Sequence, residues 1–527
     1  MSWVSHLSTE AVLSLSLILI AVPLYAALWR ARAPLGKWLV SPAIILILFL
    51  AGAIASILLM GILHATLGIS ENGSIASLVT PLCFVTLGHF SGRRMAAPNR
   101  PEGGHKRGSL LEAVQTSLSS ERKAPENHLT VAGVPVQLED ETKHFKMIGT
   151  TGTGKSTAIR ELLGGALKRG DRAVIADPDG GYAARFYDPY RDDVILNPFD
   201  ARSVRWDPFA EIENPYDVEQ LSSALIAAGE EAQAREWRGY ARTFLSAVTK
   251  GCIRAEKRDL GELWRLVNVG SDEDLRPIVA GTAAQPFLQP DSGKMFGSLR
   301  SVAISAIAAL EYIQAQRAAP FSVRDWVKNG KGVLFIPYQA TQIAALRGVI
   351  AAWIRLAIFQ AMNRGEGDQR LWFVVDELDA LGTIDGLKDA LARLRKFGGR
   401  CVLGFQSIAQ VSNTYGDGDA QTIVENCGNT LILRCSASEG GGTAKFASQL
   451  IGDREMIRPE SYRSNSRPSI FFGGHAGFNT SEGVSYRRMT EAAVMPSELE
   501  QLPDLAGYFK RASSPAWFKV TLDPTPP

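Results

Sequence analysis

The sequence predicts an α/β domain built on a parallel sheet, interrupted by an all-helical insertion and preceded by membrane-spanning helices. Three observations support this fold class. Short apolar runs alternate with helical patterns after residue 128, the strand pattern disappears between residues 205 and 318, and the first 92 residues hold long uncharged apolar segments. Strands that are apolar on both faces and separated by helices are typical of a parallel sheet covered on both sides.

Composition limits the classes of protein that need to be considered. A chain of 527 residues has room for two or three domains. The charges of its 56 basic and 54 acidic residues nearly cancel. Any binding of nucleic acid is therefore expected to depend on a local basic surface, since the chain as a whole is not strongly basic. The five cysteines show no CxxC pair and no metal-ligand spacing, which favours buried thiols in a reducing compartment over a disulfide framework.

The N-terminal region, residues 1–92, is predicted to be a transmembrane anchor. Its apolar segments 11–29, 38–67 and 74–90 contain no Lys, Arg, Asp or Glu. About 20 apolar residues cross the hydrocarbon core of a bilayer, so the first two segments are long enough and the third is at the lower limit. We therefore expect three crossings, with two crossings and one interfacial segment as the alternative. A cleaved signal peptide is disfavoured because residues 1–10 lack a positive region.

Basic residues around these segments predict the orientation of the anchor. Arg30, Arg32 and Lys37 lie between the first two segments, whereas residues 64–75 contain no Lys or Arg. A further basic group follows the third segment: Arg93, Arg94, Arg100, Lys106 and Arg107. The positive-inside rule then places the N-terminus outside and the body in the cytoplasm of a multi-pass inner-membrane protein. Residues 93–128 are expected to be a juxtamembrane linker with a short helix at 109–119. The basic cluster at the start of this linker could attract anionic lipid.

The body divides into 129–204 and 319–527, which share the α/β pattern, and an all-α insertion at 205–318. The expected strands are 144–149, 172–179, 193–199, 332–338, 371–378, 400–407 and 430–436, with helices at 156–170, 343–364 and 384–397 and a terminal hairpin at 506–520. The insertion holds 13 basic and 16 acidic residues, which suits a protein partner better than a general DNA-binding patch. Residues 461–484 are expected to form a loop or mobile hairpin.

The stretch "GTTGTGKS" at 149–156 matches G-x-x-x-x-G-K-[ST] after a strand and at the start of a helix. Its glycines permit a tight loop whose backbone N–H groups surround phosphates, while Lys155 reaches the β- and γ-phosphates and the Ser156 hydroxyl ligates Mg²⁺. The predicted cofactors are therefore ATP and Mg²⁺. The expected binding residues are Gly149, Thr150, Thr151, Gly152, Thr153, Gly154, Lys155, Ser156 and Thr157.

The strand "LWFVVDE" at 371–377 ends in two acids. Asp376 is expected beside the metal at the carboxyl edge of the sheet, and Glu377 is positioned to polarise the attacking water. A strand that merely ends in solvated acids is the alternative. Together with the phosphate-binding loop, this pair predicts hydrolysis rather than binding alone.

Three further features are candidates with open alternatives. Arg395, in the basic run at 392–400, is a candidate for an arginine that reaches a neighbouring subunit's γ-phosphate, or part of a solvated face. Gln406, at the end of "CVLGFQS", is a candidate γ-phosphate sensor, or a polar strand terminus. Trp237 and Arg238 could contact a single strand of nucleic acid that passes through a pore. A Trp at helical spacing is more often part of a hydrophobic core.

The order of these parts resembles the type IV coupling proteins of conjugation and type IV secretion, the TraD/TrwB-like family. The shared parts are a membrane anchor, "GTTGTGKS", "VIADPDGGY", a helical insertion, "VVDELDALG", and "LRKFGGRCVLGFQS" followed by "IVENCGNTLILRC". The resemblance covers nearly the whole chain. It implies a RecA-like P-loop NTPase domain that forms a homo-hexameric ring at the inner membrane, with the insertion meeting the DNA–relaxase complex. The family usually has two membrane crossings, where this sequence suggests three.

The resemblance implies an ATP-driven DNA translocase that couples a relaxosome to a type IV secretion channel during conjugation. Lys155, Glu377, Arg395 and Gln406 are the catalytic candidates, and Ser156 and Asp376 the metal ligands. The expected partners are single- or double-stranded DNA without marked sequence preference, the relaxase, inner-membrane secretion components and membrane lipids. One alternative is an FtsK-like chromosome-segregation motor, disfavoured by the short linker and by the chain ending soon after the last strand. The other is an ATP-binding docking platform for protein effectors.

Overall fold

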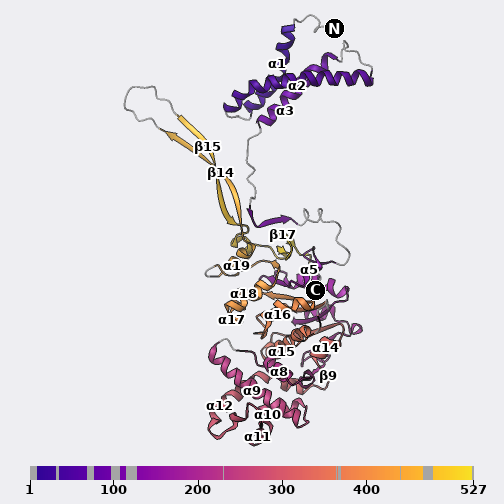
Figure 1. Ribbon diagram of the computed structural model, residues 1–527, viewed down its shortest axis with the longest axis vertical. Helices are drawn as coiled ribbons and strands as arrows, with labels where there is room; N and C mark the ends of the chain where they lie inside the picture. Colours follow the sequence, from indigo (N-terminus) through magenta and orange to yellow (C-terminus); the bar gives the residue numbers. More distant parts are fainter. Residues whose placement is uncertain are drawn as a thin grey trace, which may run out of the picture. The chain divides into compact units, whose positions relative to one another are not determined.

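The computed structural model describes residues 9–30, 35–67, 76–96, 107–113, 128–228, 231–363, 365, 370–438, 441–466 and 479–524. They belong to two compact units, Met1–Gly104 and His105–Pro527 (Figure 1). The division falls inside the predicted linker 93–128, of which residues 97–106 and 114–127 lie outside the described part.

The first unit consists of α1 (Thr9–Arg30), α2 (Leu35–Leu67) and α3 (Ala76–Ala96), close to the three predicted apolar segments. The windows Leu13–Arg30 and Gly36–Thr66 are long and apolar enough to cross a membrane, with mean hydropathies of 1.8 and 2.9. A third such window, Ile343–Met362, is 67% buried within the second unit and is a core helix. The choice between two and three crossings therefore stays a prediction.

Small residues allow α3 to approach its neighbours closely. A Cβ atom at Gly88 would lie 2.5 Å from the backbone oxygen of Ile20, and one at Gly92 would lie 2.8 Å from the Cα of Leu24. These glycines are four residues apart and face α1, which is the small-xxx-small arrangement that brings helices together in lipid. Because lipid tails compete equally for apolar surface, close backbone contact is what holds such helices to one another.

The second unit is built on a ten-stranded sheet within the described residues, in the order β2-β17-β16-β13-β5-β12-β11-β6-β10-β7. The strands from β13 to β7 run parallel to their neighbours. They are β5 (Phe145–Ile148), β6 (Arg172–Pro178), β7 (Val194–Ile195), β10 (Val333–Tyr338), β11 (Leu371–Val375), β12 (Gly399–Phe405) and β13 (Asn429–Ile432). Their carboxyl ends therefore meet at one edge, where the predicted nucleotide motifs lie.

The antiparallel side of the sheet contains the predicted terminal hairpin, β16 (Ala506–Lys510) and β17 (Ala516–Thr521). Beside β17 lies β2 (Leu110–Ala113), which pairs parallel to it. The helix expected at 109–119 is therefore wrong for residues 110–113, and residues 114–119 lie outside the described part. The free edge of β17 offers hydrogen-bonding partners that override the weak local helical pattern.

Helices cover both faces of the sheet. Successive strand residues point to opposite faces, and both sets of side chains are apolar, so each face is covered. One face packs against α6 (Lys155–Lys168), α7 (Gly181–Phe186) and the hairpin of β3 (Leu129–Val131) and β4 (Val134–Val136). The other face packs against α15 (Ile343–Met362), α16 (Leu387–Leu394), α17 (Ile408–Tyr415) and α18 (Asp417–Asn426). Ile148 and Val174 contribute to one cluster, Met147 and Ile175 to the other. The predicted α/β layering is confirmed.

The insertion begins and ends at a short parallel strand pair, β8 (Arg205–Trp206) and β9 (Pro320–Phe321). Among the described residues between them, the regular elements are helices. The α-helices are α8 (Asp217–Leu225), α9 (Ala232–Arg254), α10 (Leu260–Asn268), α11 (Asp272–Val279), α12 (Gly293–Ile307) and α13 (Leu310–Gln314). In Figure 1 they gather on the side of the sheet that carries α15, in agreement with their shared apolar cluster.

After β13 and α19 (Gly442–Ile451) the chain forms a long antiparallel hairpin of β14 (Asp453–Ser466) and β15 (Asn479–Ala492). It contains the segment 461–484, for which a loop or hairpin was expected; residues 467–478 lie outside the described part. The strand β1 (Arg107–Gly108) pairs with β14. Figure 1 shows the hairpin extending away from the sheet. The remaining helices are α5 (Leu138–Glu141), α14 (Val323–Asn329) and α20 (Pro496–Glu500).

Candidate functional site

The loop between β5 and α6 has the conformation that its glycines predict. Gly152 and Gly154 have φ angles of 78° and 114°, in the region that favours glycine. A Cβ atom at Gly154 would also lie 2.9 Å from the Cδ2 of Leu505. The loop thus turns directly into the N-terminus of α6, where free backbone N–H groups and the helix dipole favour an anion.

Segments far away in the sequence hold this loop in place. The Thr150 N–H donates to the carbonyl of Arg434 at 2.9 Å, and the Leu505 N–H donates to the carbonyl of Thr153 at 2.9 Å. The buried Thr153 hydroxyl closes the turn by donating to the Thr150 carbonyl at 2.7 Å. Thr151 is exposed at the tip, and Thr157 is half-buried in the first turn of α6.

Lys155 is folded onto its own loop. Its Nζ donates to the carbonyl of Gly149 at 2.6 Å and to that of Thr150 at 3.2 Å. Burial lowers the pKa of this ammonium group, while the nearby Asp376 and Glu377 oppose the shift. The ammonium group therefore caps the loop and is close enough to Asp376 and Glu377 for their charges to act on it.

Asp376 and Ser156 meet although 220 positions in the sequence separate them. The Ser156 hydroxyl donates to Oδ2 of Asp376 at 2.6 Å, and the Tyr182 hydroxyl donates to the same oxygen at 2.8 Å. The other oxygen, Oδ1, is buried and has no hydrogen-bond partner among the residues that the structure describes. A buried carboxylate oxygen without a partner, next to a serine hydroxyl, fits the oxygen-ligand chemistry of Mg²⁺.

Glu377 and Gln406 follow adjacent strands and lie together at the sheet edge. The Gln406 side-chain amide donates to Oε1 of Glu377 at 3.4 Å. Burial raises the pKa of Glu377, and the carboxylates of Asp376 and Asp379 raise it further. A partly buried glutamate with a raised pKa, close to a phosphate-binding loop, has the properties of a general base.

The basic run before β12 divides into exposed and buried members. Arg393, Arg395 and Lys396 are exposed. Arg400 is 1% exposed and its Nε donates to Oε2 of Glu141 at 2.8 Å, so it is a structural residue of the sheet. Arg395 precedes β12, whose seven residues separate it from Gln406 by roughly 20 Å. It therefore lies at the edge of the sheet opposite its own phosphate-binding loop.

Sequence reasoning missed two residues that organise the acidic group. Tyr182 is 2% exposed, and besides its bond to Asp376 its backbone N–H donates to Asp177 at 2.9 Å. Burial raises the pKa of Asp177 to about 6, although the N–H groups of Tyr182 and Ala183 oppose this. Both residues lie in the stretch "VIADPDGGY". An acid at the end of a strand, followed by two glycines and a tyrosine, was the available signal.

A cavity of about 450 Å³ lies beside these residues, at the carboxyl ends of β6 and β10. Its lining includes Asp179, Asn197, Tyr338 and Gln342. Tyr338 is 4% exposed, and its hydroxyl has no partner among the described residues. Polar groups that converge in a cavity at the carboxyl edge of a parallel sheet are typical of a ligand site.

Trp237 and Arg238 lie in α9, away from the sheet edge. Trp237 is half-buried and packs edge-on against Tyr240, with ring centroids 6.1 Å apart. Arg238 is exposed and donates to the carbonyl of Ala227 at 3.0 Å. These contacts give Trp237 a packing role within the insertion, and the pore contact stays a prediction.

Three comparisons with known proteins bear on this site. A family model described as the type IV secretion-system coupling protein DNA-binding domain matches residues 128–523. Coupling protein TraD of Escherichia coli (strain K12) is 29% identical over 444 residues, which are 82% of this chain and 60% of that protein. This chain therefore spans less than two thirds of the length of TraD.

Two solved structures are similar over most of the body. Bacterial conjugative coupling protein TrwBdeltaN70, in its unbound monoclinic form, aligns with a TM-score of 0.70 and 31% identity, covering 81% of this chain and 95% of that one. Plasmid coupling protein TrwB in complex with ADP and Mg²⁺ aligns with a TM-score of 0.69 and 30% identity, covering 80% and 94%. Both similarities extend well beyond the nucleotide motifs.

Proposed function

The chain belongs to the family of type IV secretion-system coupling proteins, and on this premise we propose that it is an ATP-driven DNA translocase anchored in the bacterial inner membrane. In this role it couples a relaxase–DNA complex to a type IV secretion channel. One observation carries the proposal most directly. Ser156 and Asp376 meet at the phosphate-binding loop, leaving one buried carboxylate oxygen without a partner among the described residues.

The nucleotide supplies the phosphoanhydride, and Mg²⁺ neutralises the charge of its phosphates when bound. Residues 149–157 hold the phosphates, and Ser156 and Asp376 hold the metal ion. Lys155 has an ammonium group that is free to exchange its contacts with Gly149 and Thr150 for phosphate oxygens. The similarity to TrwB, whose structure contains ADP and Mg²⁺, supports this choice of cofactors.

Glu377 accepts a proton from the attacking water, a role for which its raised pKa and its position one residue after Asp376 are suited. Gln406, whose amide contacts Glu377, senses the γ-phosphate and orients that carboxylate. Tyr182 keeps Asp376 oriented by a hydrogen bond. These residues form the part of the hydrolytic site that one subunit supplies, and each either touches the reacting groups or holds a residue that does.

Arg395 acts on the neighbouring subunit of a homo-hexamer. It is exposed and lies at the edge of the sheet opposite its own loop, so it can reach a phosphate only in another copy. An arginine supplied in trans stabilises the charge of the transition state and makes hydrolysis depend on assembly. The ring encloses the DNA, which is held without sequence preference.

The domain boundaries follow the sequence: anchor 1–92, linker 93–128, RecA-like domain 129–204 and 319–527, and insertion 205–318. The anchor contacts lipid and the inner-membrane components of the secretion channel, with the body in the cytoplasm. The insertion, with its acidic excess, contacts the relaxase and its accessory proteins rather than DNA.

ATPase activity of the full-length protein in nanodiscs, measured with and without single- and double-stranded DNA, tests this function. We expect DNA to stimulate turnover, and Lys155→Ala and Glu377→Gln to abolish it while the fold persists. ATPase activity indifferent to DNA would favour the docking platform for protein effectors. Plasmid transfer that survives Lys155→Ala in cells would favour a chromosome-segregation motor of the FtsK kind.

A further inference from the structure

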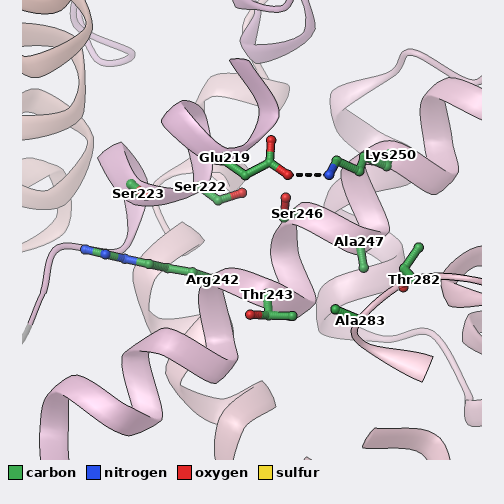
Figure 2. Close-up of a pocket in the computed structure, with 10 residues that line it drawn as sticks. All are labelled: Glu219, Ser222, Ser223, Arg242, Thr243, Ser246, Ala247, Lys250, Thr282 and Ala283. Atoms are coloured by element: carbon green, nitrogen blue, oxygen red, sulfur yellow. Dashed lines mark hydrogen bonds and ion pairs between the residues drawn. The ribbon is translucent and has the colours of Figure 1, made fainter. Parts of the chain in front are cut away.

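The insertion contains a pocket of about 260 Å³ between α8, α9 and the loop that follows α11 (Figure 2). It lies outside the nucleotide site, and its lining is dominated by hydroxyl groups with a few charges. The hydroxyl residues are Ser222, Ser223, Thr243, Ser246 and Thr282, and the charged residues are Glu219, Arg242 and Lys250.

Two of the hydroxyl groups are buried without a hydrogen-bond partner. Ser222 is 2% exposed and Ser246 is 8% exposed, and neither Oγ has a partner among the described residues. In Figure 2 both side chains lie beside the Glu219–Lys250 ion pair, and the guanidinium group of Arg242 extends away from them. Buried hydroxyl groups are nearly always satisfied in native proteins, so two of them in one pocket indicate a group that they bind.

The charges around the two serine hydroxyl groups indicate the chemical class of the ligand group. Arg242 and Lys250 outnumber Glu219, so the lining carries a net positive charge inside an insertion that is acidic as a whole. Both cations already hold carboxylates of this chain. Lys250 pairs with Glu219, and Nη2 of Arg242 lies 3.3 Å from Oδ2 of Asp385. These contacts are partly exposed, and a ligand carboxylate can compete for them.

We propose that this pocket binds a carboxylate of a partner polypeptide, either an acidic side chain or a C-terminus. Ser222 and Ser246 donate to its oxygens, and Lys250 supplies the adjacent positive charge. Arg242 adds positive charge further along the lining, where its Nε donates to the carbonyl of Ile226 at 2.6 Å. A polypeptide fits better than nucleic acid because the lining holds only Arg242 and Lys250 as cations, which suits one carboxylate and not a run of phosphates. The volume of about 260 Å³ is below that of most small-molecule sites and suits a single residue of a docked chain.

This inference extends the proposed partner surface of the insertion, but binding at the pocket requires no nucleotide turnover. Its test is therefore separate from that of the translocase. The pocket can bind a carboxylate in a protein that does not translocate DNA, and a DNA translocase can lack this binding. The probe is a fluorescein-labelled hexaglutamate peptide, titrated by fluorescence polarisation against the full-length protein in nanodiscs of zwitterionic lipid. Hexalysine and a short DNA duplex serve as comparison ligands.

The Ser222→Ala/Ser246→Ala double variant isolates the pocket because it leaves every charge in place. We expect it to weaken hexaglutamate binding at least about tenfold, since hydrogen bonds to a charged group are lost. Its thermal midpoint should not fall, because the hydroxyl groups removed have no partners in the unliganded fold. Ser298→Ala is the matched control; its exposed hydroxyl lies on α12 and donates to the carbonyl of Lys294.

Glu219→Gln gives a second result of opposite sign. This change removes the carboxylate that competes for Lys250. Hexaglutamate should therefore bind several-fold more tightly to the variant than to the wild type. If the ion pair only stabilises the fold, the variant should bind hexaglutamate more weakly or not at all. Equal binding by the wild type and the double serine variant would overturn the proposal. So would hexalysine binding as well as hexaglutamate, or a DNA duplex whose binding the double variant abolishes.

Discussion

At the scale of single residues, Asp376 has a different environment on each of its two oxygens. Oδ2 accepts hydrogen bonds from Ser156 and Tyr182, whereas Oδ1 is buried without a partner in the described part of the chain. Ser156 and Asp376 were both predicted from motifs, because the chemistry of a phosphate-binding loop and of an acidic strand end is encoded locally. Tyr182 was missed because its bond to Asp376 spans 194 residues of sequence.

Tyr182→Phe tests this arrangement. The change removes only the hydroxyl that orients Asp376, so we expect ATPase activity to fall about tenfold or more, with more Mg²⁺ needed for half-maximal turnover. A Mg²⁺ titration of ATPase activity measures both effects. Tyr187→Phe is the control, because Tyr187 lies nearby and packs edge-on against Phe335. An unchanged Mg²⁺ requirement in Tyr182→Phe would contradict the assigned role.

His144 predicts a pH dependence of stability. Burial lowers its pKa to about 4; its Nδ1 accepts from the Cys401 N–H, and its Nε2 therefore donates to the carbonyl of Leu391. Between pH 6.5 and 4 the unfolded chain binds a proton at this group that the folded chain does not. Stability from His144 is thus complete above pH 6.5 and is lost as the pH falls, by about 3 kcal/mol in total.

His144→Asn should flatten this dependence. Asparagine tolerates the φ of 58° at this position and does not titrate. Thermal midpoints of the wild type and the variant, measured from pH 7.5 down to pH 5, report the difference directly. Asp177, with its pKa raised to about 6, has the opposite sign but is present in both proteins, so it cancels in the comparison. Parallel curves would show that His144 does not contribute as described.

At the scale of elements, the insertion is tied to the segment that follows Glu377. Asp385 accepts from Arg242 of α9 at 3.3 Å, and its carbonyl accepts from Arg355 of α15 at 3.1 Å. Arg355 also donates to the carbonyl of Gln220 in α8 at 3.0 Å. The short segment that follows the acidic strand end therefore contacts α9 of the insertion directly, and it is linked to α8 through Arg355 of α15. This connection allows the nucleotide site and the insertion to influence one another.

Asp385→Asn tests that coupling. Because the ion pair with Arg242 is partly exposed and the one with Arg355 is long, at 3.9 Å, their loss should cost about 1 kcal/mol and leave the fold and basal ATPase activity intact. We expect the stimulation of ATPase activity by DNA to fall several-fold, since the link between the insertion and the post-strand segment is weakened. Asp419→Asn breaks a similar exposed pair with Lys388 that does not reach the insertion, and should leave stimulation unchanged. Equal stimulation in both variants would exclude this route.

Elements were predicted from the sequence to very different degrees. The strands of the parallel sheet were predicted because they are apolar on both faces, and the hairpin β16–β17 because it has a clear turn. The strand β2 was not, because its structure depends on the free edge of β17, about 400 residues further along the chain. A local sequence pattern predicts an element when the residues of that element determine its secondary structure. It fails when pairing with a distant strand determines it, as for β2.

At the scale of the whole molecule, the two units differ in their packing. The helices of the first unit approach closely at Gly88 and Gly92 beside a small apolar cluster, whereas the second unit has two large apolar clusters on the faces of its sheet. This difference follows from the solvents that the proposal assigns to them, lipid and water. The order of motifs along the chain predicted the family, which the match to residues 128–523 confirmed.

The proposed function requires that ATP hydrolysis moves this protein along DNA, and a triplex-displacement assay measures that movement. The full-length protein in nanodiscs is given ATP, Mg²⁺ and a duplex that carries a labelled third strand, and release of that strand is followed in time. We predict release with ATP that is lost with Glu377→Gln and with a non-hydrolysable ATP analogue. ATP hydrolysis that DNA stimulates but that never releases the third strand would show that hydrolysis does not drive movement along DNA.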